Sequence, residues 1–433
     1  MNRIVKNAFW IVGCKVIKMF LTLIVTILIS RYLGPSNYGL INYAAGLVAF
    51  VTPLMKLGID AIMTYEVIQY PDEEGKIIGT SMVMNVISSL LCVLGIIAFT
   101  YIANTGETET LVVCTIYSII LIFQALEIIQ YWFQAKLLSK YTAIATVLAY
   151  FIVSVIQIIL LATKMNIYFF TLSYLCEYFV IDIFLIIEYK KLGKHKIQYS
   201  FSIAKRLLAK GKYYIVSSMM VTIFAQTDKI MLKLMVNNEA VGYYSAGVTC
   251  AGMASFVFAA IIDSMRSTIF ESKKVSQSQF EKNVVNLYSI IIYFSIIVSA
   301  FICILSPIIV KILYGSQYES TIGVLRIIVW YTTFSYLGTV RNIWILAENK
   351  QKYLWKINLS GATLNIIINA ILIPSFGVTG AAIASLTTQI FTNVFVGYIL
   401  KTIRRNNELM FKACKPSTIV NIIKKVNCFR KET

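Results

Sequence analysis

Apolar segments of about 20 residues recur twelve times along this chain, and short polar gaps separate them. A helix rises about 1.5 Å per residue and the hydrocarbon core of a bilayer is about 30 Å thick, so each segment can cross a membrane as one helix. Inside a bilayer the backbone has no water to bind, which favours helices over open strands. The pattern predicts an all-α polytopic membrane protein with about 12 transmembrane helices.

Turn-forming residues mark several of the gaps between these segments. They are Gly34-Pro35, Pro71, Gly106, Gly315 and Pro374-Ser375. The gaps are short except at 190–212, at 266–283 and after Leu400. The predicted spans are 8–30, 39–63, 77–103, 111–133, 143–163, 167–189, 213–236, 241–265, 284–313, 322–347, 355–373 and 378–400.

Lysine and arginine are distributed unevenly over the gaps. Of the 39 Lys and Arg, 29 fall in the termini and in every second gap or within three residues of them, 3 fall in the intervening gaps or equally near them, and 7 lie deeper within spans. Cytoplasmic segments of membrane proteins carry an excess of these residues. The distribution predicts that the N- and C-termini both lie in the cytoplasm. It also supports an even number of spans, because one missed span would scatter the charges over both sides.

Composition limits the function classes. The chain is 58% hydrophobic and 14% charged, whereas a soluble domain is about a quarter charged. The formal charge of +19 would suggest nucleic acid in a soluble protein. Here it follows from cytoplasmic retention of Lys and Arg, and no basic helix or zinc pattern stands apart from the spans. We therefore expect no nucleic-acid partner. The apolar stretch 9–29 is too long for a signal peptide, so we interpret it as the first span.

No residue pattern for covalent chemistry stands out. The eight cysteines form no C-x-x-C pair, so we predict neither a metal site nor a disulfide framework. The sequence also offers no nucleophile with a base and no phosphate-cradling loop. We therefore expect no cofactor, no direct use of ATP and no enzyme activity.

The two halves of the chain share short motifs in the same order. Trp132-x-x-Ala135 followed by Lys140-Tyr141 returns 212 residues later as Trp344-x-x-Ala347 followed by Lys352-Tyr353. Gly39 matches Gly242, and Ile59-Asp60 matches Ile262-Asp263, at a separation of 203. An indel of nine residues reconciles the two separations. Because both separations contain an even number of spans, the copies share an orientation, which predicts parallel repeats about a pseudo-two-fold axis along the membrane normal.

The repeat suggests a division of the chain into lobes. We predict an N-terminal six-helix lobe at 1–189, a basic cytoplasmic linker at 190–212 and a C-terminal six-helix lobe at 213–400. A basic cytoplasmic tail follows at 401–433. Two such bundles around a central cavity are suited to alternating access.

Charged residues within the spans are the candidate functional groups. A charge at mid-membrane costs about 2.5–3.5 kcal/mol on insertion scales, so such residues usually face a cavity. Lys15 and Lys18 share one polar face of the first span with Thr22, and no acid lies on that face. In the seventh span, the counterpart in the repeat, Lys229 and Lys233 also share a polar face. Two lysines without an acid favour an anionic cargo such as a phosphate or pyrophosphate.

Other intramembrane charges complete the candidate set. Lys56, Lys233 and Arg326 lie near span ends, where the alternative is that they snorkel to the headgroups, and Lys56 with Asp60 can be a structural ion pair. The predicted substrate-binding charges are Lys15, Lys18, Lys56, Lys229, Lys233, Arg326 and Arg341. The candidate ion-coupling acids are Asp60, Asp263 and Glu127.

Three strings resemble the signature of Wzx-type polysaccharide-biosynthesis flippases, within the multidrug/oligosaccharidyl-lipid/polysaccharide superfamily. They are Arg31-Tyr-Leu-Gly-Pro-Ser-Asn-Tyr-Gly39, Asp228-Lys229-Ile-Met-Leu232 with Val241-Gly242-Tyr-Tyr-Ser-Ala246, and Pro374-Ser-Phe-Gly377-Val-Thr-Gly380-Ala-Ala. The resemblance covers about 1–405. Its motif members are Arg31, Gly34, Pro35, Gly39, Asp228 and Gly242, of which Gly34-Pro35 and Gly39 are expected to shape a turn.

The resemblance implies a MATE-like V shape and a function. The implied function is translocation of an undecaprenyl-pyrophosphate-linked oligosaccharide across the bacterial cytoplasmic membrane by alternating access, for O-antigen, capsule or exopolysaccharide. The implied partners are this lipid-linked substrate and membrane lipids, and further candidates are a polymerase and a chain-length regulator of the same pathway.

Three alternatives stay open at this stage. Two belong to the same superfamily: a cation-coupled multidrug antiporter and a peptidoglycan-precursor flippase, the second of which would have two extra spans. The third is a membrane polymerase or glycosyltransferase, which would need a sizeable outer loop.

Overall fold

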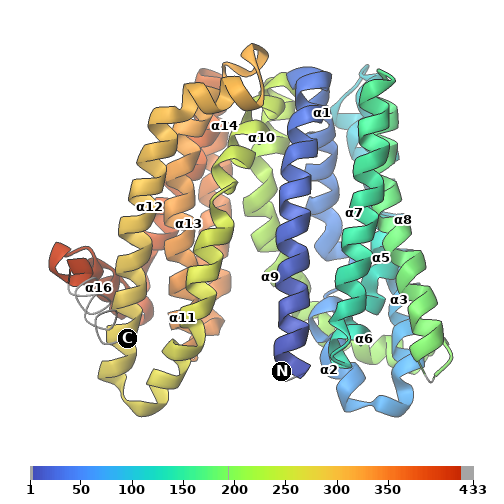
Figure 1. Cartoon of the computed structure of the whole chain (residues 1–433), viewed down its shortest axis with the longest axis horizontal. Helices are drawn as coiled ribbons and strands as arrows, with labels where there is room; N and C mark the ends of the chain where they lie inside the picture. The colour runs from blue at the N-terminus through green and yellow to red at the C-terminus, as the bar shows by residue number, and fades with distance from the viewer. Residues whose placement is uncertain (1–2, 194, 421–433) are drawn as a thin grey trace. The chain divides into compact units, whose positions relative to one another are not determined.

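The computed structural model describes residues 3–193 and 195–420, with backbone alone for 3–12 and 14–16. All regular structure in these ranges is helical. The chain divides into two compact units, unit 1 (Met1–Gly242) and unit 2 (Tyr243–Thr433). Each unit is described by itself, with the helices labelled in Figure 1.

Unit 1 is a bundle of long helices with one early sharp turn. Its helices are α1 (Arg3–Met55), α2 (Ile59–Gln69), α3 (Glu74–Ala103), α4 (Thr108–Ser118), α5 (Ile120–Leu126), α6 (Gln130–Ala135), α7 (Ser139–Ala162), α8 (Ile167–Leu192), α9 (Phe201–Met235) and the start of α10 (Asn238–Gly252). Within α1, Gly34 has φ 73° and ψ 172°. Glycine enters this region without a Cβ penalty, so the predicted turn at Gly34-Pro35 is confirmed.

Unit 2 continues with helices of similar length. They are α11 (Ser255–Val275), α12 (Gln277–Leu313), α13 (Thr321–Ala347), α14 (Leu354–Ile390), α15 (Val396–Ile399) and α16 (Arg404–Ala413). Helix α14 breaks at Gly377, which has φ 54° and ψ −129°. The break predicted at Pro374-Ser375 is therefore displaced by a turn, because the glycine, and not the proline, adopts the non-helical conformation. A π-helical turn at Phe391–Phe395 separates α14 from α15.

The helices account for the predicted spans. Among the described residues, eight helical segments are long and apolar enough to cross a membrane, and α10 with α11, bent by 44°, makes a ninth if the pair is one span. Helices α1 and α14 each contain a non-helical glycine, so each covers two predicted spans. Helix α13 covers the span predicted at 322–347. The described residues thus place a helical segment at each of the twelve predicted spans.

The same helix ending occurs in both units, as the sequence repeat predicts. Trp132 and Trp344 are both buried in the hydrophobic core of their unit. The helices end three residues later, at Ala135 and Ala347, and a residue with positive φ follows in each case, Leu137 (φ 56°) or Asn349 (φ 54°). The next amides, Leu138 N and Lys350 N, donate back to Phe133 O and Ile345 O. Equivalent residues at a separation of 212 thus make equivalent hydrogen bonds.

The segment predicted as a linker is bound to unit 1. Residues 201–212 form the first turns of α9, and the preceding stretch lies on α3, where Gln198 N donates to Gly75 O and Ser200 N to the Thr80 hydroxyl. A Cβ at Gly75 would meet the backbone of residue 196 at 2.3 Å, so this close approach requires glycine. The contacts group α9 with unit 1. The predicted lobes 1–189 and 213–400 stay a prediction.

Ion pairs fasten the basic start of α9 to the connection between α2 and α3. Lys210 pairs with Glu66 at 2.5 Å, and Arg206 pairs with Glu73 at 2.8 Å. The Glu66 side chain is fully buried, so its charge requires these partners. The basic residues at the start of α9 therefore stabilise the packing of unit 1, in addition to their expected role in setting the orientation of the protein in the membrane.

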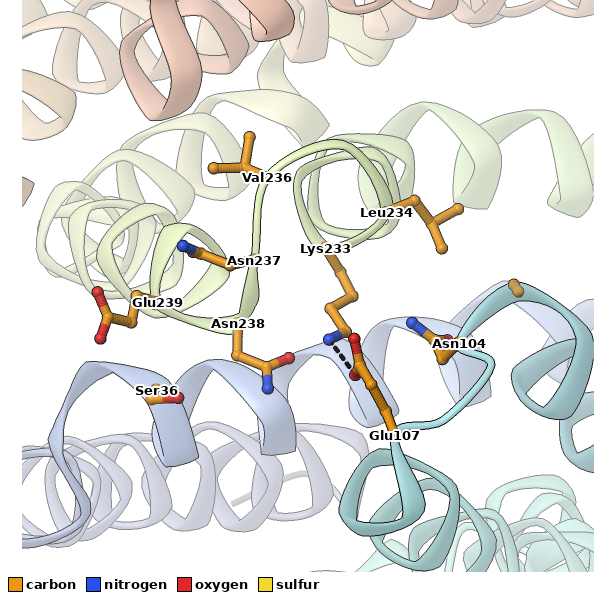
Figure 2. Close-up of a pocket in the computed structure, with 10 residues that line it drawn as sticks. Ser36, Asn104, Glu107, Lys233, Leu234, Val236, Asn237, Asn238 and Glu239 are labelled. Atoms are coloured by element: carbon orange, nitrogen blue, oxygen red, sulfur yellow. Dashed lines mark hydrogen bonds and ion pairs between the residues drawn. The ribbon is translucent and has the colours of Figure 1, made fainter.

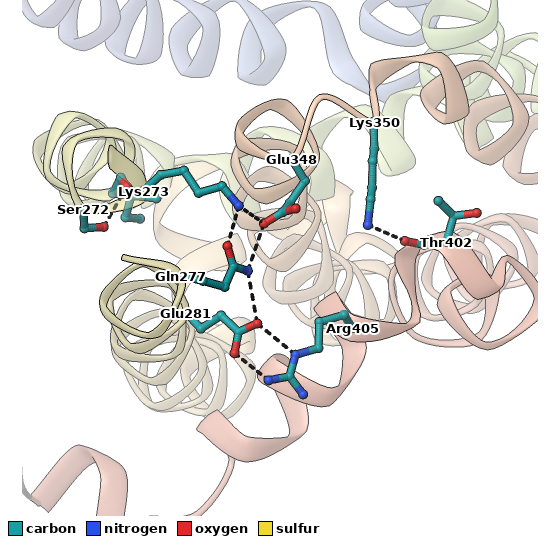
Figure 3. A network of polar contacts seen from close by, with 9 residues as sticks. Ser272, Lys273, Gln277, Glu281, Glu348, Lys350, Thr402 and Arg405 are labelled. Carbon is teal, nitrogen blue, oxygen red and sulfur yellow. Dashed lines mark hydrogen bonds and ion pairs between the residues drawn. The ribbon is translucent and has the colours of Figure 1, made fainter. Parts of the chain in front are cut away.

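The predicted tail begins with a docked helix. Helix α16 buries Leu409 and Met410 in the core of unit 2, and the Tyr288 hydroxyl of α12 donates to Asn406 Oδ1. Figure 3 shows the polar network beside it, in which Arg405 donates to both oxygens of Glu281. Hydrogen bonds to Glu281 and Glu408 raise the pKa of Arg405 above its usual range. Residues 421–433 lie outside the described part of the chain.

Gly39 and Gly242 allow two backbones to touch. A Cβ at Gly39 would lie 1.8 Å from Asn238 O, and a Cβ at Gly242 would lie 2.1 Å from Pro35 O. The two contacts are reciprocal: Pro35 corresponds to Asn238, and Gly39 to Gly242, at the same separation of 203. A two-fold axis produces such isologous contacts. Gly39 lies inside α1, so its expected role in the turn is wrong, and it serves close packing instead.

We predict that Gly39→Ala and Gly242→Ala destabilise the protein. The new Cβ meets backbone oxygen, which cannot move aside cheaply, so the loss should be roughly 3 kcal/mol. The measurement is thermal unfolding of purified protein in detergent. Gly95→Ala is the matched control, because nothing lies within 4 Å of its Cβ position. That variant should be neutral or gain up to about 1 kcal/mol from helix propensity. Equal unfolding temperatures for all three variants would contradict the packing role.

We also predict that Arg405→Gln loosens α16. The ion pair is partly exposed, so the loss should be about 0.5–1 kcal/mol, or a roughly two- to fivefold rise in amide exchange over 404–413. Hydrogen exchange with mass spectrometry measures it. The control is Lys415→Gln, at an exposed lysine directly after the helix, which should leave the exchange of α16 unchanged. If both variants exchange at the same rate as the parent, the network does not hold the helix.

Candidate functional site

A charged cluster lies inside the spans of unit 1. Lys18 of α1 pairs with Glu177 of α8 at 2.5 Å, and its ammonium group lies 5.3 Å from the centre of the Tyr150 ring on α7. The Lys18 side chain is 35% exposed and that of Glu177 is 11% exposed. Three helices thus place one cation, one carboxylate and one phenol ring together at membrane depth.

Tyrosines and a second acid surround this pair. The rings of Tyr117 on α4 and Tyr174 on α8 lie 5.7 Å apart, and Tyr174 precedes Glu177 by about one turn of α8. The charges of Lys18, Lys56 and Glu177 act on Glu127, which begins the 3₁₀ turn Glu127–Ile129 between α5 and α6. The cluster therefore combines the cations Lys18 and Lys56 with two carboxylates and several hydroxyl-bearing rings, which can bind polar hydroxyl groups.

The pairing corrects one expectation. Lys18 has no acid on its own helix face, as the sequence indicates, but α8 supplies one from 159 residues away. The expectation that Lys18 is unpaired is therefore wrong. A buried ammonium without a partner would be costly, and Glu177 removes that cost. The side chain of Lys15 lies outside the described residues.

The candidate coupling acids differ in their surroundings. Asp60 lies 3.8 Å from Lys56, so the predicted i,i+4 pair is present. Asp263 is exposed and pairs with Arg266 at 3.0 Å. Glu127 forms no hydrogen bond or ion pair with any residue that the structure describes. Nearby Asp182, which the sequence did not single out, is buried, and within residues 3–420 neither of its carboxylate oxygens has a hydrogen-bond partner.

The two lysines of α9 have different environments. Lys229 lies beside Asp228 and packs against Gly46 of α1. Lys233 is buried, and its ammonium group binds Glu107 at 2.5 Å. Glu107 also accepts a hydrogen bond from the Thr110 hydroxyl at 2.6 Å. Burial acts to raise the pKa of Glu107, but the hydrogen bonds from Lys233 and Thr110 outweigh it and hold the pKa below its usual value.

Lys233 and Glu107 face a polar hollow of about 370 Å³ at the end of unit 1 where α3 gives way to α4. Figure 2 shows the ion pair with the amide nitrogen of Asn104 turned toward it. The Tyr43 hydroxyl donates to Asn104 Oδ1 at 3.0 Å, which orients that amide. Further lining groups come from the turn after α9 and the start of α10: Asn237, Asn238 and Glu239.

In unit 2 the buried cation is Arg341 of α13. Its Nη1 donates to Thr392 O in the π-helical turn at 2.7 Å, and its Nη2 donates to Asn342 Oδ1 at 3.2 Å. Within the described ranges its Nε has no hydrogen-bond partner and no carboxylate pairs with it. Arg326, in contrast, is exposed and donates to the Ser306 hydroxyl at 3.1 Å. Arg326 thus keeps exposed N–H groups at its Nη atoms, whereas the unused N–H of Arg341 is buried.

The remaining motif residues lie near the first turn and along α9. Arg31 is exposed at the end of the first span, and Asp228 is buried on α9. Glu107, Asn104 and Asn238 could not be predicted as site residues because they lie in gaps between spans, where polar residues are ordinary. The partner of Lys18 could not be predicted because the register between two helices leaves no mark in either segment.

Comparison with known proteins identifies the family of this chain. The family of polysaccharide biosynthesis proteins matches residues 4–265. A putative O-antigen transporter of Escherichia coli is 23% identical over 88% of this chain and 91% of its own. The capsular polysaccharide biosynthesis protein CapF of Staphylococcus aureus is 21% identical over 92% and 100%. An uncharacterized membrane protein of Methanocaldococcus jannaschii is 28% identical, and there the chain spans about half of the relative, 51%.

Solved structures agree on the fold. The lipid II flippase MurJ in an inward closed conformation matches with a TM-score of 0.73, at 15% identity over 92% of this chain and 89% of its own. An inward-facing MATE-family multidrug transporter of the MOP superfamily matches with a TM-score of 0.65, at 13% identity over 90% and 96%. The predicted all-α, MATE-like membrane fold is thereby confirmed, and the chain belongs to the polysaccharide biosynthesis protein family.

Proposed function

We propose that this protein is a flippase that moves a lipid-linked oligosaccharide across the cytoplasmic membrane by alternating access, for the synthesis of a surface polysaccharide. The observation that carries the proposal is the family match together with similarity over nearly the whole chain to an O-antigen transporter and a capsular polysaccharide protein. The cargo is taken to be an oligosaccharide on undecaprenyl pyrophosphate. A polymerase and a chain-length regulator are proposed as pathway partners.

The sidedness of the protein is part of this proposal. The excess of Lys and Arg in alternate gaps supports cytoplasmic N- and C-termini. In unit 1 the N-terminus lies at the same end as α2 and α6 (Figure 1). The start of α9, with Arg206 and Lys210, contacts this same end through Glu66 and Glu73. The polar hollow at the far end of α3 then belongs to the outer face.

Cargo binding at Lys18 is proposed to be an exchange of partners. The ammonium group that binds Glu177 can bind the pyrophosphate of the cargo instead, as a point charge. Glu177 would then lose its cation in a low-dielectric region, and it must find another partner or take up a proton. The tyrosines around the pair supply hydroxyl groups and flat ring faces that suit sugars. No covalent step is required, so the protein is proposed to be a transporter and not an enzyme.

Additional cations are proposed to assist. Arg341 has an unused Nε–H among the described residues, so it is the candidate of unit 2 for the anionic headgroup. Lys56, Lys229 and Arg326 remain proposals as substrate contacts, as does Lys15. Asp60 and Asp263 have cationic neighbours, whereas Glu127 has neither a hydrogen bond nor an ion pair within residues 3–420. Glu127 is therefore the favoured site for an ion that couples transport to a gradient.

The decisive experiment is leaflet-resolved detection of lipid-linked glycan in a deletion strain. The proposal expects the glycan to accumulate in the inner leaflet and to reach the outer leaflet when the gene is restored. A drug-resistance change without any glycan change would instead favour the multidrug-antiporter alternative. Accumulation of a peptidoglycan precursor would favour the other alternative within the superfamily.

Neutralising the ion pair tests the exchange of partners. We predict that the double variant Lys18→Gln with Glu177→Gln is inserted at normal levels but exports at least tenfold less glycan, because the paired amides keep the packing and lose the ammonium. The measurement is surface glycan normalised to protein in the membrane. The control is Lys191→Gln with Glu188→Gln, which neutralises an exposed ion pair on α8 and should export normally. Normal export by the Lys18 double variant would remove its assigned role.

A second prediction concerns Glu127. Export by the parent protein should fall when a protonophore collapses the proton gradient. Residual export by Glu127→Gln should not respond, because a neutral amide cannot bind and release a proton. Glu127→Asp keeps the ionisable group and should still respond. An equal response of the Gln and Asp variants to the protonophore would exclude Glu127 as the coupling site.

A further inference from the structure

Unit 1 contains a second hollow, which is apolar. It has a volume of about 480 Å³. Its walls come from three helices: Phe50 and Val51 of α1, Gly95 and Phe99 of α3, and Ile230 and Met231 of α9. Gly95 leaves space here, since nothing lies within 4 Å of its Cβ position. The hollow can therefore hold a hydrocarbon chain.

The apolar hollow adjoins the polar hollow that contains Lys233 and Glu107. Leu234 lines both. On α3, Phe99 lines the apolar hollow and Ala103 lines the polar one, and residues four apart lie on the same helix face. The two hollows thus follow each other along α3 and α9, the apolar one next to the polar one.

We infer that α3 and α9 form a binding site for one glycolipid molecule, with its chain in the apolar hollow and its sugar headgroup in the polar hollow. The site contains neither Lys18 nor Arg341. It is therefore an additional lipid site, separate from Lys18 and Arg341, and it includes Lys233 from the predicted substrate-binding charges. The inference rests on the proposed function for the placement of this end of unit 1 at the outer face.

The lining of the polar hollow favours a sugar. Sugar hydroxyl groups both donate and accept, and the lining offers amides from Asn104 and Asn238 and carboxylates from Glu107 and Glu239. Asn238 Oδ1 is buried and has no hydrogen-bond partner in the described part of the chain, so it is ready to accept from a hydroxyl group.

Charge disfavours a simple anionic headgroup. The lining has two carboxylates against the single ammonium group of Lys233, and that ammonium group already binds Glu107. A phosphate without sugars would meet net negative charge and would have to break this pair. Sugar hydroxyls can bind around the intact pair. In a glycolipid whose sugar is joined to its chain through a phosphate, the phosphate would lie at the boundary between the two hollows. Lys233 lies at this boundary, because it precedes Leu234, which lines both hollows.

The test is photolabelling of the full-length protein in nanodiscs of phosphatidylethanolamine and phosphatidylglycerol. The probe is dodecyl maltoside with a diazirine in its alkyl chain, and labelled peptides are identified by mass spectrometry. We expect labels on residues 95–99 of α3 and 230–234 of α9. Excess unlabelled dodecyl maltoside should reduce them at least fivefold, whereas dodecylphosphocholine at the same concentration should reduce them less than twofold.

Substitutions test the apolar end and the polar end of the site independently. Gly95→Leu fills the apolar hollow and should lower labelling at least fivefold relative to Gly95→Ala. Leu94→Phe adds bulk on the exposed face of the same helix and should label normally. Asn238→Leu should keep the chain site but lose the headgroup preference, so that both competitors act equally.

Two outcomes overturn the inference: labels absent from α3 and α9, or equal competition by the two detergents in the parent protein. The parent competition needs no variant, so it decides the question even if Gly95→Leu fails to fold. Labelling also needs no transport. If a deletion strain exports glycan normally while labelling is as expected, the proposed function fails and the lipid site stands. The reverse result removes the lipid site alone.

Discussion

The absence of water from the spans governs this structure. A charge that enters the hydrocarbon region must find its partner within the protein. Lys18 has Glu177, Lys233 has Glu107, and Arg341 has a backbone carbonyl of the π-helical turn. Each partner comes from another helix or from a turn, so the charges also fix how the helices are arranged. An anion that binds Lys18 competes with Glu177, which links binding to a local rearrangement.

The sequence predicts features that one segment determines by itself. Span length follows from hydrophobicity, and the turn at Gly34 follows from a residue that tolerates positive φ. The repeated helix ends at Ala135 and Ala347 follow from matching local motifs. Contacts between segments cannot be predicted in this way. The docking of 196–200 on Gly75 and Gly79, and the packing of Gly39 on Asn238, depend on which helices approach each other, and a lone glycine does not reveal its neighbour.

The candidate site shows the same limit. The polar face with Lys18 could be read from the helical period, but its acid lies on α8, and the choice among several acids depends on helix register. The hollow beside Lys233 is built mainly from residues outside the predicted spans. The polar hollow can be interpreted as part of a lipid site only because the neighbouring apolar hollow shares the lining residue Leu234. Unit 1 thus contains the Lys18–Glu177 cluster on α1 and α8 and, further along α1, the two hollows lined by α3 and α9.

The reciprocal contact of Gly39 and Gly242 has an evolutionary consequence. If the repeat arose by duplication, the contact that is now made once within a chain corresponds to the meeting of two identical copies across a dyad. In that ancestor one glycine codon would have encoded the glycine of both contacts. A single mutation would therefore have introduced a side chain at both contacts at once. Gene fusion freed the two positions to vary separately. Both positions are nevertheless glycine, and the two contacts set how closely α1 and α10 approach.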